Sequence, residues 1–284
     1  MSVARPVMDN VGVDSLSELK SWPADNVAVA VIGDDGAVRA TYGDQQRVFR
    51  LASVTKLLTA YAVLVAIEEE AIGWDLPAGP EGSTVRHLAA HASGLNFDNR
   101  SVVAAPGTRR IYSNEGFAVL GETIADSTGI AFADYLAEAV CRPLGMSATR
   151  LEGTPGAGGF ASCIDLSLFA AELQAPKLIS TETLTEATSI AFPGLNGILP
   201  GYGRQSPNDW GLGFELRDHK KPHWTAASNS PRTFGHFGQS GTFLWVDPDA
   251  RLSCVALTDN NFGEWALERW PALSELVLRD HRSA

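Results

Sequence analysis

The most informative stretch of this sequence reads Ser53-Val-Thr-Lys56-Leu-Leu-Thr-Ala-Tyr-Ala-Val-Leu-Val-Ala-Ile67. It is apolar on most faces and contains neither glycine nor proline, which predicts a buried helix over residues 53–70. A glycine and a proline shortly afterwards end that helix. Positions i and i+3 share one face of a helix, so the hydroxyl of Ser53 and the amine of Lys56 can touch.

The chemistry of this pair depends on burial of the lysine. Burial disfavours the charged ammonium and lowers the pKa of Lys56, so a neutral amine can accept the Ser53 proton and create a nucleophile. N–H groups at the helix N-terminus would favour the developing negative charge. Alternatively, Ser53 is only an N-cap and Lys56 is solvated. Ser17-Glu-Leu-Lys20 fits the same pattern, but on a short polar stretch that would leave the lysine pKa unchanged.

A second stretch, Tyr112-Ser-Asn114, precedes a helix predicted over residues 115–127. Its spacing puts the phenol and the amide on the same side of an extended turn. The phenol can relay a proton, and the amide can hold a substrate carbonyl. The alternative interpretation is purely structural, with Ser113 or Asn114 capping the helix.

A third stretch reads Gly235-His236-Phe237-Gly238-Gln239-Ser-Gly-Thr242 and leads into a predicted strand. Its glycines permit a ligand to approach the backbone closely. A strand edge beside the nucleophile could also supply a second N–H group for an oxyanion. Alternatively, the stretch is a glycine-rich bend in which His236 is a half-buried strand residue.

The predicted strands lie towards both ends of the chain, with helices between them. We therefore expect an α/β fold in which one antiparallel sheet, built from N- and C-terminal strands, is flanked by helices and carries a mostly helical insertion. Residues 1–50 and 205–284 would form the sheet-containing lobe and residues 51–204 the mainly helical lobe, with the active site between them. The predicted strands are 27–32, 38–42, 211–216, 242–246 and 252–258, the remaining helices are 14–22, 85–91, 132–141, 162–174 and 264–279, and the loops are 193–209 and 218–233.

Composition narrows the possible partners. The 284 residues carry a net charge of -11 without a basic cluster, which argues against binding to nucleic acid or anionic lipid. The longest apolar run, 57–67, is shorter than the ~20 residues of a membrane span, and residues 1–10 resemble no secretory leader. Three scattered cysteines and six histidines lack metal-ligand spacing, so we expect no metal and no cofactor. These features favour a cytoplasmic location and leave the oligomeric state open.

Taken in this order, the three stretches resemble the motifs of the class C β-lactamase and D-alanyl-D-alanine carboxypeptidase family. These are penicillin-recognising serine hydrolases, and many members are carboxylesterases. The resemblance implies a β-lactamase/transpeptidase-like fold and runs from about Val27 to the last helix. Supporting matches are Leu88-Ala-Ala-His-Ala-Ser-Gly-Leu95, Pro143-Leu-Gly-Met146, Gly158-Gly-Phe-Ala-Ser-Cys-Ile-Asp165 and Leu244-Trp-Val-Asp-Pro248.

The resemblance also implies an acyl-enzyme mechanism. Ser53 would attack an ester, amide or β-lactam carbonyl of a small molecule, and Lys56 and Tyr112 would share the general base and acid work. The N–H groups of Ser53 and Gln239 would form the oxyanion hole. The substrate-binding residues that it implies are Asn114, which would orient the substrate or Lys56, and His236, Gly238 and Gln239.

Two departures from the family pattern bear on the substrate. β-Lactamases of this family usually carry Lys-Thr-Gly as third motif, and its lysine helps to hold the substrate carboxylate; here His236 and Phe237 occupy the first two positions. Without that lysine or a leader, an esterase-like hydrolase is favoured. A true β-lactamase or carboxypeptidase and a non-catalytic penicillin-binding-like sensor remain alternatives. An α/β-hydrolase is disfavoured because residues 238–242 do not complete a Gly-x-Ser-x-Gly elbow.

Overall fold

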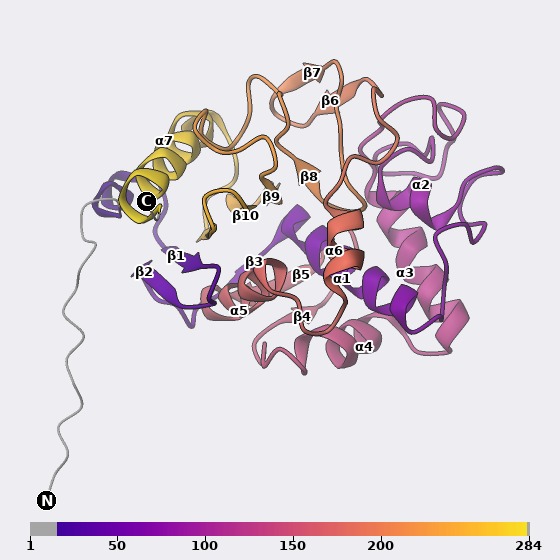
Figure 1. Cartoon of the computed structure of the whole chain (residues 1–284), viewed down its shortest axis with the longest axis horizontal. Coiled ribbons are helices and arrows are strands. Elements are labelled where there is room, and N and C mark those ends of the chain that lie inside the picture. Colours follow the sequence, from indigo (N-terminus) through magenta and orange to yellow (C-terminus); the bar gives the residue numbers. More distant parts are fainter. Residues whose placement is uncertain (1–15, 283–284) are drawn as a thin grey trace, which may run out of the picture.

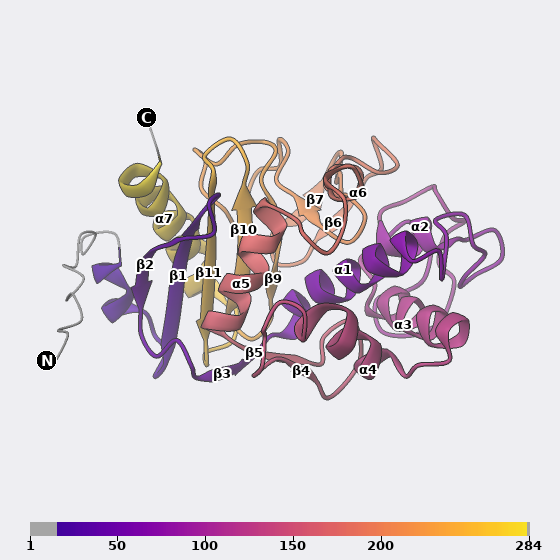
Figure 2. The same ribbon diagram turned by 60° about the horizontal axis from the view of Figure 1, so that its bottom comes forward.

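Six antiparallel strands form the central sheet of the computed structural model, in the order β2-β1-β11-β10-β9-β8. Figure 1 views this sheet end-on, and Figure 2 shows β2, β1, β11, β10 and β9 side by side. Strands from the two ends of the chain meet at its centre, because Val27 pairs with Thr258 and Gly33 with Leu252. This confirms the predicted antiparallel sheet. The strands are β1 (Val27–Gly33), β2 (Val38–Tyr42), β8 (Glu215–Leu216), β9 (Phe234–Gly238), β10 (Thr242–Asp247) and β11 (Leu252–Thr258).

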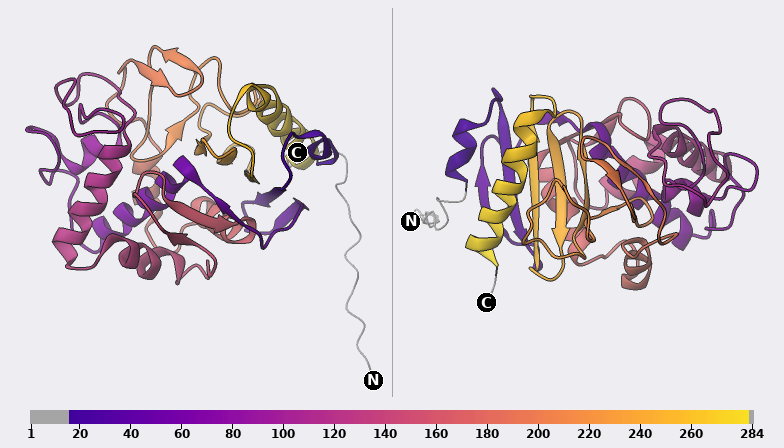
Figure 3. Two further views of the ribbon diagram at one scale, coloured as in Figure 1. Left: turned by 180° about the vertical axis from the view of Figure 1, so that it is seen from behind. Right: turned by 90° about the horizontal axis from the view of Figure 1, so that it is seen from above.

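The sheet is buried on both faces, as alternation along β1 shows. Ala28, Ala30 and Ile32 belong to one hydrophobic cluster, whereas Val29 and Val31 belong to another. Successive strand residues point to opposite faces, so the two clusters lie on the two sides of the sheet. The helices that cover these faces are α5 (Cys163–Gln174) and α7 (Glu264–His281), which Figures 2 and 3 show on opposite sides.

The remaining helices gather beside the sheet (Figure 2). At their centre, every residue of α1 from Thr55 to Ala66 is buried, as expected for a helix that is apolar all round. The other elements of this region are α2 (Val85–Ala89), α3 (Asn114–Thr128), α4 (Phe132–Leu136) with a following π turn (Ala137–Cys141), α6 (Thr181–Ala187), and the short strands β3 (Val48–Arg50), β4 (Arg150–Leu151) and β5 (Gly159–Ser162).

Three local predictions are wrong. The predicted strand 211–216 is reduced to β8, because Gly213 has a φ of 93° and the N–H of Gly211 turns back to the carbonyl of Phe214. The predicted loop 193–209 contains a hairpin of β6 (Gly197–Leu199) and β7 (Gly203–Gln205). The described part of the predicted helix 14–22 is a single 3-10 helix (Ser17–Ser21).

The structure describes residues 16–282. The prediction that residues 1–10 hold no leader therefore concerns residues outside the described range. Helix α5 falls within the range predicted for the helical lobe, yet it packs on β1 and β11; the division into two lobes stays a prediction. Within the described range, none of the helices combines the length and the apolarity needed to cross a membrane.

Candidate active site

Ser53 lies in a 3-10 turn (Ala52–Val54) that leads directly into α1. The predicted start of the helix is therefore a tighter 3-10 turn, and Ser53 is the middle residue of that turn. Ala52 has a φ of 45°, which is uncommon for a residue with a Cβ and stores backbone strain beside the hydroxyl. The turn is held by Thr55, whose hydroxyl donates to the carbonyl of Ala52 at 2.6 Å. The Ser53 side chain is half-buried.

Lys56 lies on the first turn of α1 with no exposed surface. Its Nζ lies 3.4 Å from Ser53 Oγ, 2.6 Å from Asn114 Oδ1 and 2.8 Å from the Gly156 carbonyl. Burial lowers the pKa of Lys56 well below its ordinary value, because the ammonium loses its water and gains no carboxylate. A neutral amine donates twice and accepts once, so donation to Asn114 and Gly156 leaves its lone pair for the Ser53 proton.

Tyr112 reaches the same hydroxyl from the segment before α3. Its Oη donates to Ser53 Oγ at 2.7 Å, and burial raises the pKa of Tyr112. The phenol therefore stays protonated and serves as a proton donor, whereas the amine of Lys56 serves as the base. Ser113, between the two site residues, caps α3 by accepting from Gly116 N–H at 3.0 Å. This stretch therefore caps α3 through Ser113 and also brings Tyr112 to Ser53 and Asn114 to Lys56.

The third stretch forms β9, which passes directly behind the 3-10 turn. A Cβ at Gly238 would lie 2.3 Å from the carbonyl oxygen of Leu51 and 3.2 Å from the amide nitrogen of Ser53, so only glycine fits this approach. Gln239 follows as an exposed residue, and its side chain donates to the Phe262 carbonyl at 3.3 Å. The strand edge thus runs beside the backbone of the candidate nucleophile.

His236 lies on β9 with its ring 5.7 Å from that of Tyr112. Its Nδ1 donates to the Phe237 carbonyl at 2.6 Å, and its buried Nε2 has no partner among the described residues. Burial and the neighbouring Lys56 lower the pKa of His236 to about 3. The imidazole is therefore neutral at pH 7, and Nε2, which carries no proton when Nδ1 donates, is a hydrogen-bond acceptor.

His91 is a site neighbour to which the sequence analysis assigned no role. Its Nδ1 accepts from Ser113 N–H at 3.1 Å, and its ring lies 4.7 Å from that of Tyr112. Its backbone φ of 55° is unusual for a residue other than glycine. His91 thus supports the phenol from behind. It stood within one of the supporting family matches, which was the only sequence signal for it.

The comparison with protein families agrees with this geometry. A model of the Beta-lactamase family matches residues 23–278. The chain belongs to the Beta-lactamase family. Members of this family are serine hydrolases. In this chain Lys56 and Tyr112 contact Ser53 Oγ, and Gly238 of the third stretch packs against the backbone of Ser53.

Other members of the Beta-lactamase family give a more detailed comparison. A crystal structure of a beta-lactamase from Mycobacterium bovis is 55% identical, covers 95% of this chain and 100% of its own, and superposes with a TM-score of 0.93. Penicillin-binding protein 4* of Bacillus subtilis is 28% identical over 36% of this chain. The carboxypeptidase/endopeptidase AmpH of Escherichia coli is 24% identical over 46% of this chain. The matched regions span 30% and 46% of these two curated relatives.

Acid should destabilise the fold through the buried histidines. Burial lowers the pKa of both His91 and His236, so below pH 6.5 the unfolded chain binds protons that the folded chain does not. Each histidine should therefore reduce the unfolding free energy by about 2 kcal/mol between pH 6.5 and pH 5. Urea unfolding at both pH values measures this loss.

The matched controls are His236→Gln, which should reduce the acid-induced loss, and His219→Gln at an exposed side chain, which should not change it. An unfolding free energy that stays constant from pH 7 to pH 5 would contradict the prediction.

Proposed function

We propose that this chain is an esterase-like serine hydrolase that cleaves small acyl substrates through an acyl-enzyme on Ser53. The observation that carries the proposal is the position of Ser53 Oγ, which lies 3.4 Å from the buried amine of Lys56 and 2.7 Å from the phenol oxygen of the half-buried Tyr112. A base and a proton donor on one hydroxyl are what nucleophilic catalysis requires.

The proposed reaction proceeds in two halves. Lys56 removes the Ser53 proton as Oγ attacks the carbonyl, and the N–H groups of Ser53 and Gln239 receive the oxyanion. Tyr112 then protonates the leaving alcohol. Water attacks the acyl group in the second half, with the same base and acid in exchanged roles. Asn114 keeps the amine of Lys56 aligned through its 2.6 Å contact.

The preference for esters rests on the third motif. The resemblance places a lysine there in β-lactamases, whereas this chain has a neutral His236 with an apolar Phe237 beside it. The site therefore lacks a fixed cation on β9 for the carboxylate of a β-lactam. A true β-lactamase or carboxypeptidase is the second candidate, and it is favoured by the name of the 55% identical protein from Mycobacterium bovis.

Substrate turnover separates these candidates. We expect a higher kcat/KM for p-nitrophenyl butyrate than for nitrocefin, and a fluorophosphonate should modify Ser53, as read from the mass of its peptide. Faster turnover of nitrocefin would support the second candidate instead. A stable label on Ser53 without turnover of either substrate would support a non-catalytic sensor.

A further inference from the structure

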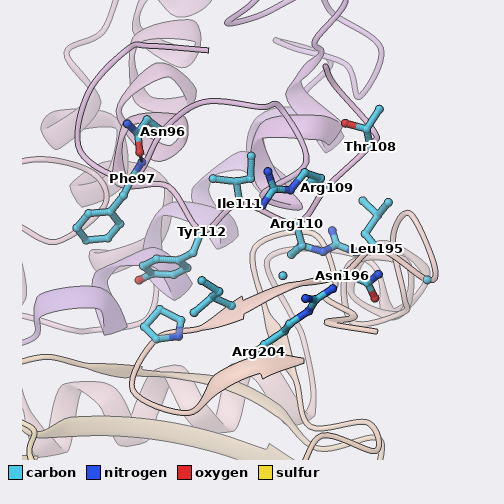
Figure 4. A pocket seen from close by; sticks show the side chains of 14 residues that line it. Asn96, Phe97, Thr108, Arg109, Arg110, Ile111, Tyr112, Leu195, Asn196 and Arg204 are labelled. Atoms are coloured by element: carbon cyan, nitrogen blue, oxygen red, sulfur yellow. Dashed lines mark hydrogen bonds between the residues drawn. The ribbon is translucent and has the colours of Figure 1, made fainter. Parts of the chain in front are cut away.

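A cavity of about 790 Å³ adjoins the candidate active site at Tyr112 (Figure 4). Among the described residues that line it are Arg109, Arg110 and Arg204 but no aspartate or glutamate. The whole chain carries 33 acidic against 22 basic residues. A cavity lining whose charged residues are all arginines therefore differs from the overall charge of the chain. Ser53 does not line the cavity. Tyr112 does, and its hydroxyl donates to Ser53 Oγ, so this side chain connects the cavity with the candidate nucleophile.

Arg110 has a structural role in the cavity wall. Its buried guanidinium donates to the backbone carbonyls of Ala90, Ala191, Phe192 and Asn208. These hydrogen bonds join the segment before α3 to the segment before β6. Asp209 also interacts electrostatically with Arg110, so Arg110 holds the cavity wall together and is not counted as a free charge for a ligand.

Arg109 and Arg204 differ from Arg110 because both are exposed and neither guanidinium has a hydrogen-bond or ion-pair partner within residues 16–282. Arg204 lies on β7 opposite Ile198 of β6, and cross-strand partners share one face of a hairpin. Figure 4 shows Arg204 extending from this hairpin towards the wall that carries Arg109 and Arg110. The segment that carries Arg109 adjoins the β6–β7 hairpin, because Arg110 N–H donates to the Asn196 carbonyl at 3.0 Å. The two unpartnered guanidinium groups thus belong to adjoining parts of one cavity lining.

The part of the cavity near the nucleophile is apolar. Phe97 stacks on Tyr112 with ring centroids 5.8 Å apart and is 46% exposed, and Ile198 is 64% exposed. Both side chains line the same cavity, and apolar side chains gathered in a concavity are typical of a small-molecule site. The cavity therefore offers an apolar path from the phenol to the arginines, within the range of volumes typical of small-molecule sites.

We propose that the substrate of this enzyme carries an anionic group of the carboxylate type, which Arg109 and Arg204 bind while the scissile carbonyl lies at Ser53. The proposal rests on the proposed function, because it assigns the substrate class of the same site. An arginine fork matches a planar carboxylate in shape and charge.

Two pairs of matched esters test the proposal. The acyl side is tested with the p-nitrophenyl monoester of glutarate against p-nitrophenyl valerate. The leaving-group side is tested with the butyrate esters of 4-hydroxyphenylacetate and of 4-ethylphenol. In at least one pair we expect a roughly tenfold higher kcat/KM for the anionic ester, and this preference should decline as sodium chloride screens the charges.

Substitution then assigns the preference to the two arginines. Arg109→Gln and Arg204→Gln should each lower, roughly tenfold, the ratio of kcat/KM for the preferred anionic ester to kcat/KM for its neutral partner. Arg142→Gln is the charge-matched control, because this arginine is 73% exposed and pairs with Glu138 away from the cavity. Equal rates within both ester pairs, or a preference that survives in both variants, would overturn the proposal.

Binding without turnover keeps this proposal separate from the proposed function. Calorimetric titration of Ser53→Ala protein with glutarate should show binding that is lost in the Ser53→Ala/Arg204→Gln double variant. Ser53-dependent hydrolysis of neutral esters without glutarate binding would retain the proposed function and reject the anionic substrate. Glutarate binding without any Ser53-dependent hydrolysis would retain the anion-binding role of the arginines and reject the proposed function.

Discussion

Replacement of Ser53 by alanine should lower kcat for p-nitrophenyl butyrate at least about 10³-fold, because no other group can take over the covalent step. The fold should persist. The side chain is only half-buried, and the substitution removes one oxygen without opening a cavity among the core residues of α1. Initial rates, together with a thermal melt of the same sample, measure both parts of the expectation.

Ser17→Ala provides the matched control, because Ser17 and Lys20 repeat the Ser-x-x-Lys spacing within the 3-10 helix near the start of the described chain. This variant should retain the wild-type rate and the fluorophosphonate label. Residual hydrolysis by Ser53→Ala within tenfold of wild type, in protein that melts normally, would remove Ser53 from the mechanism.

Replacement of Lys56 by methionine should slow acylation by ~10²-fold or more, since the side chain keeps its approximate volume but loses the base. Lys56→Arg should be equally slow, because a guanidinium stays protonated and cannot accept the Ser53 proton. Tyr112→Phe removes the proton donor and should slow the reaction by a similar factor. Single-turnover acylation rates distinguish these effects from changes in deacylation.

The pH profile gives an independent test of the base. Burial lowers the pKa of Lys56 well below its ordinary value, and only the neutral amine acts. The kcat/KM of wild type should therefore fall as pH decreases through that lowered pKa and should be level above it. A rate that keeps rising to pH 10.5, where an ordinary lysine titrates, would show that Lys56 is not a neutral base in the folded protein.

Much of the framework could be predicted from local sequence patterns. The apolar run after Ser53 predicted a buried helix, and α1 is buried along its length from Thr55 to Ala66. Likewise, the helix predicted over residues 115–127 is α3, which Gly129 ends in the left-handed conformation with a φ of 72°. Both signals act within a few residues of one another, so they are readable without the tertiary structure.

The wrong prediction of a loop over residues 193–209 also has a local cause. In the stretch 193–209, Gly201 and Gly203 adopt φ values of 75° and 78° and turn the chain into the β6–β7 hairpin. Glycine content alone does not distinguish such a turn from an irregular loop, because glycine adopts both conformations readily. The prediction of a loop therefore missed the element that carries Arg204.

By itself, the sequence determined the helix behind Ser53, the order of the three motifs and the resemblance to a family, because helix periodicity and short motifs are properties of neighbouring residues. The tertiary structure alone decided that Lys56 lies without solvent exposure between Asn114 and Gly156. It also brought Arg204 to the cavity that Arg109 lines. These contacts join segments far apart in the chain, and only packing of the whole core fixes their distance and sets the protonation of the amine.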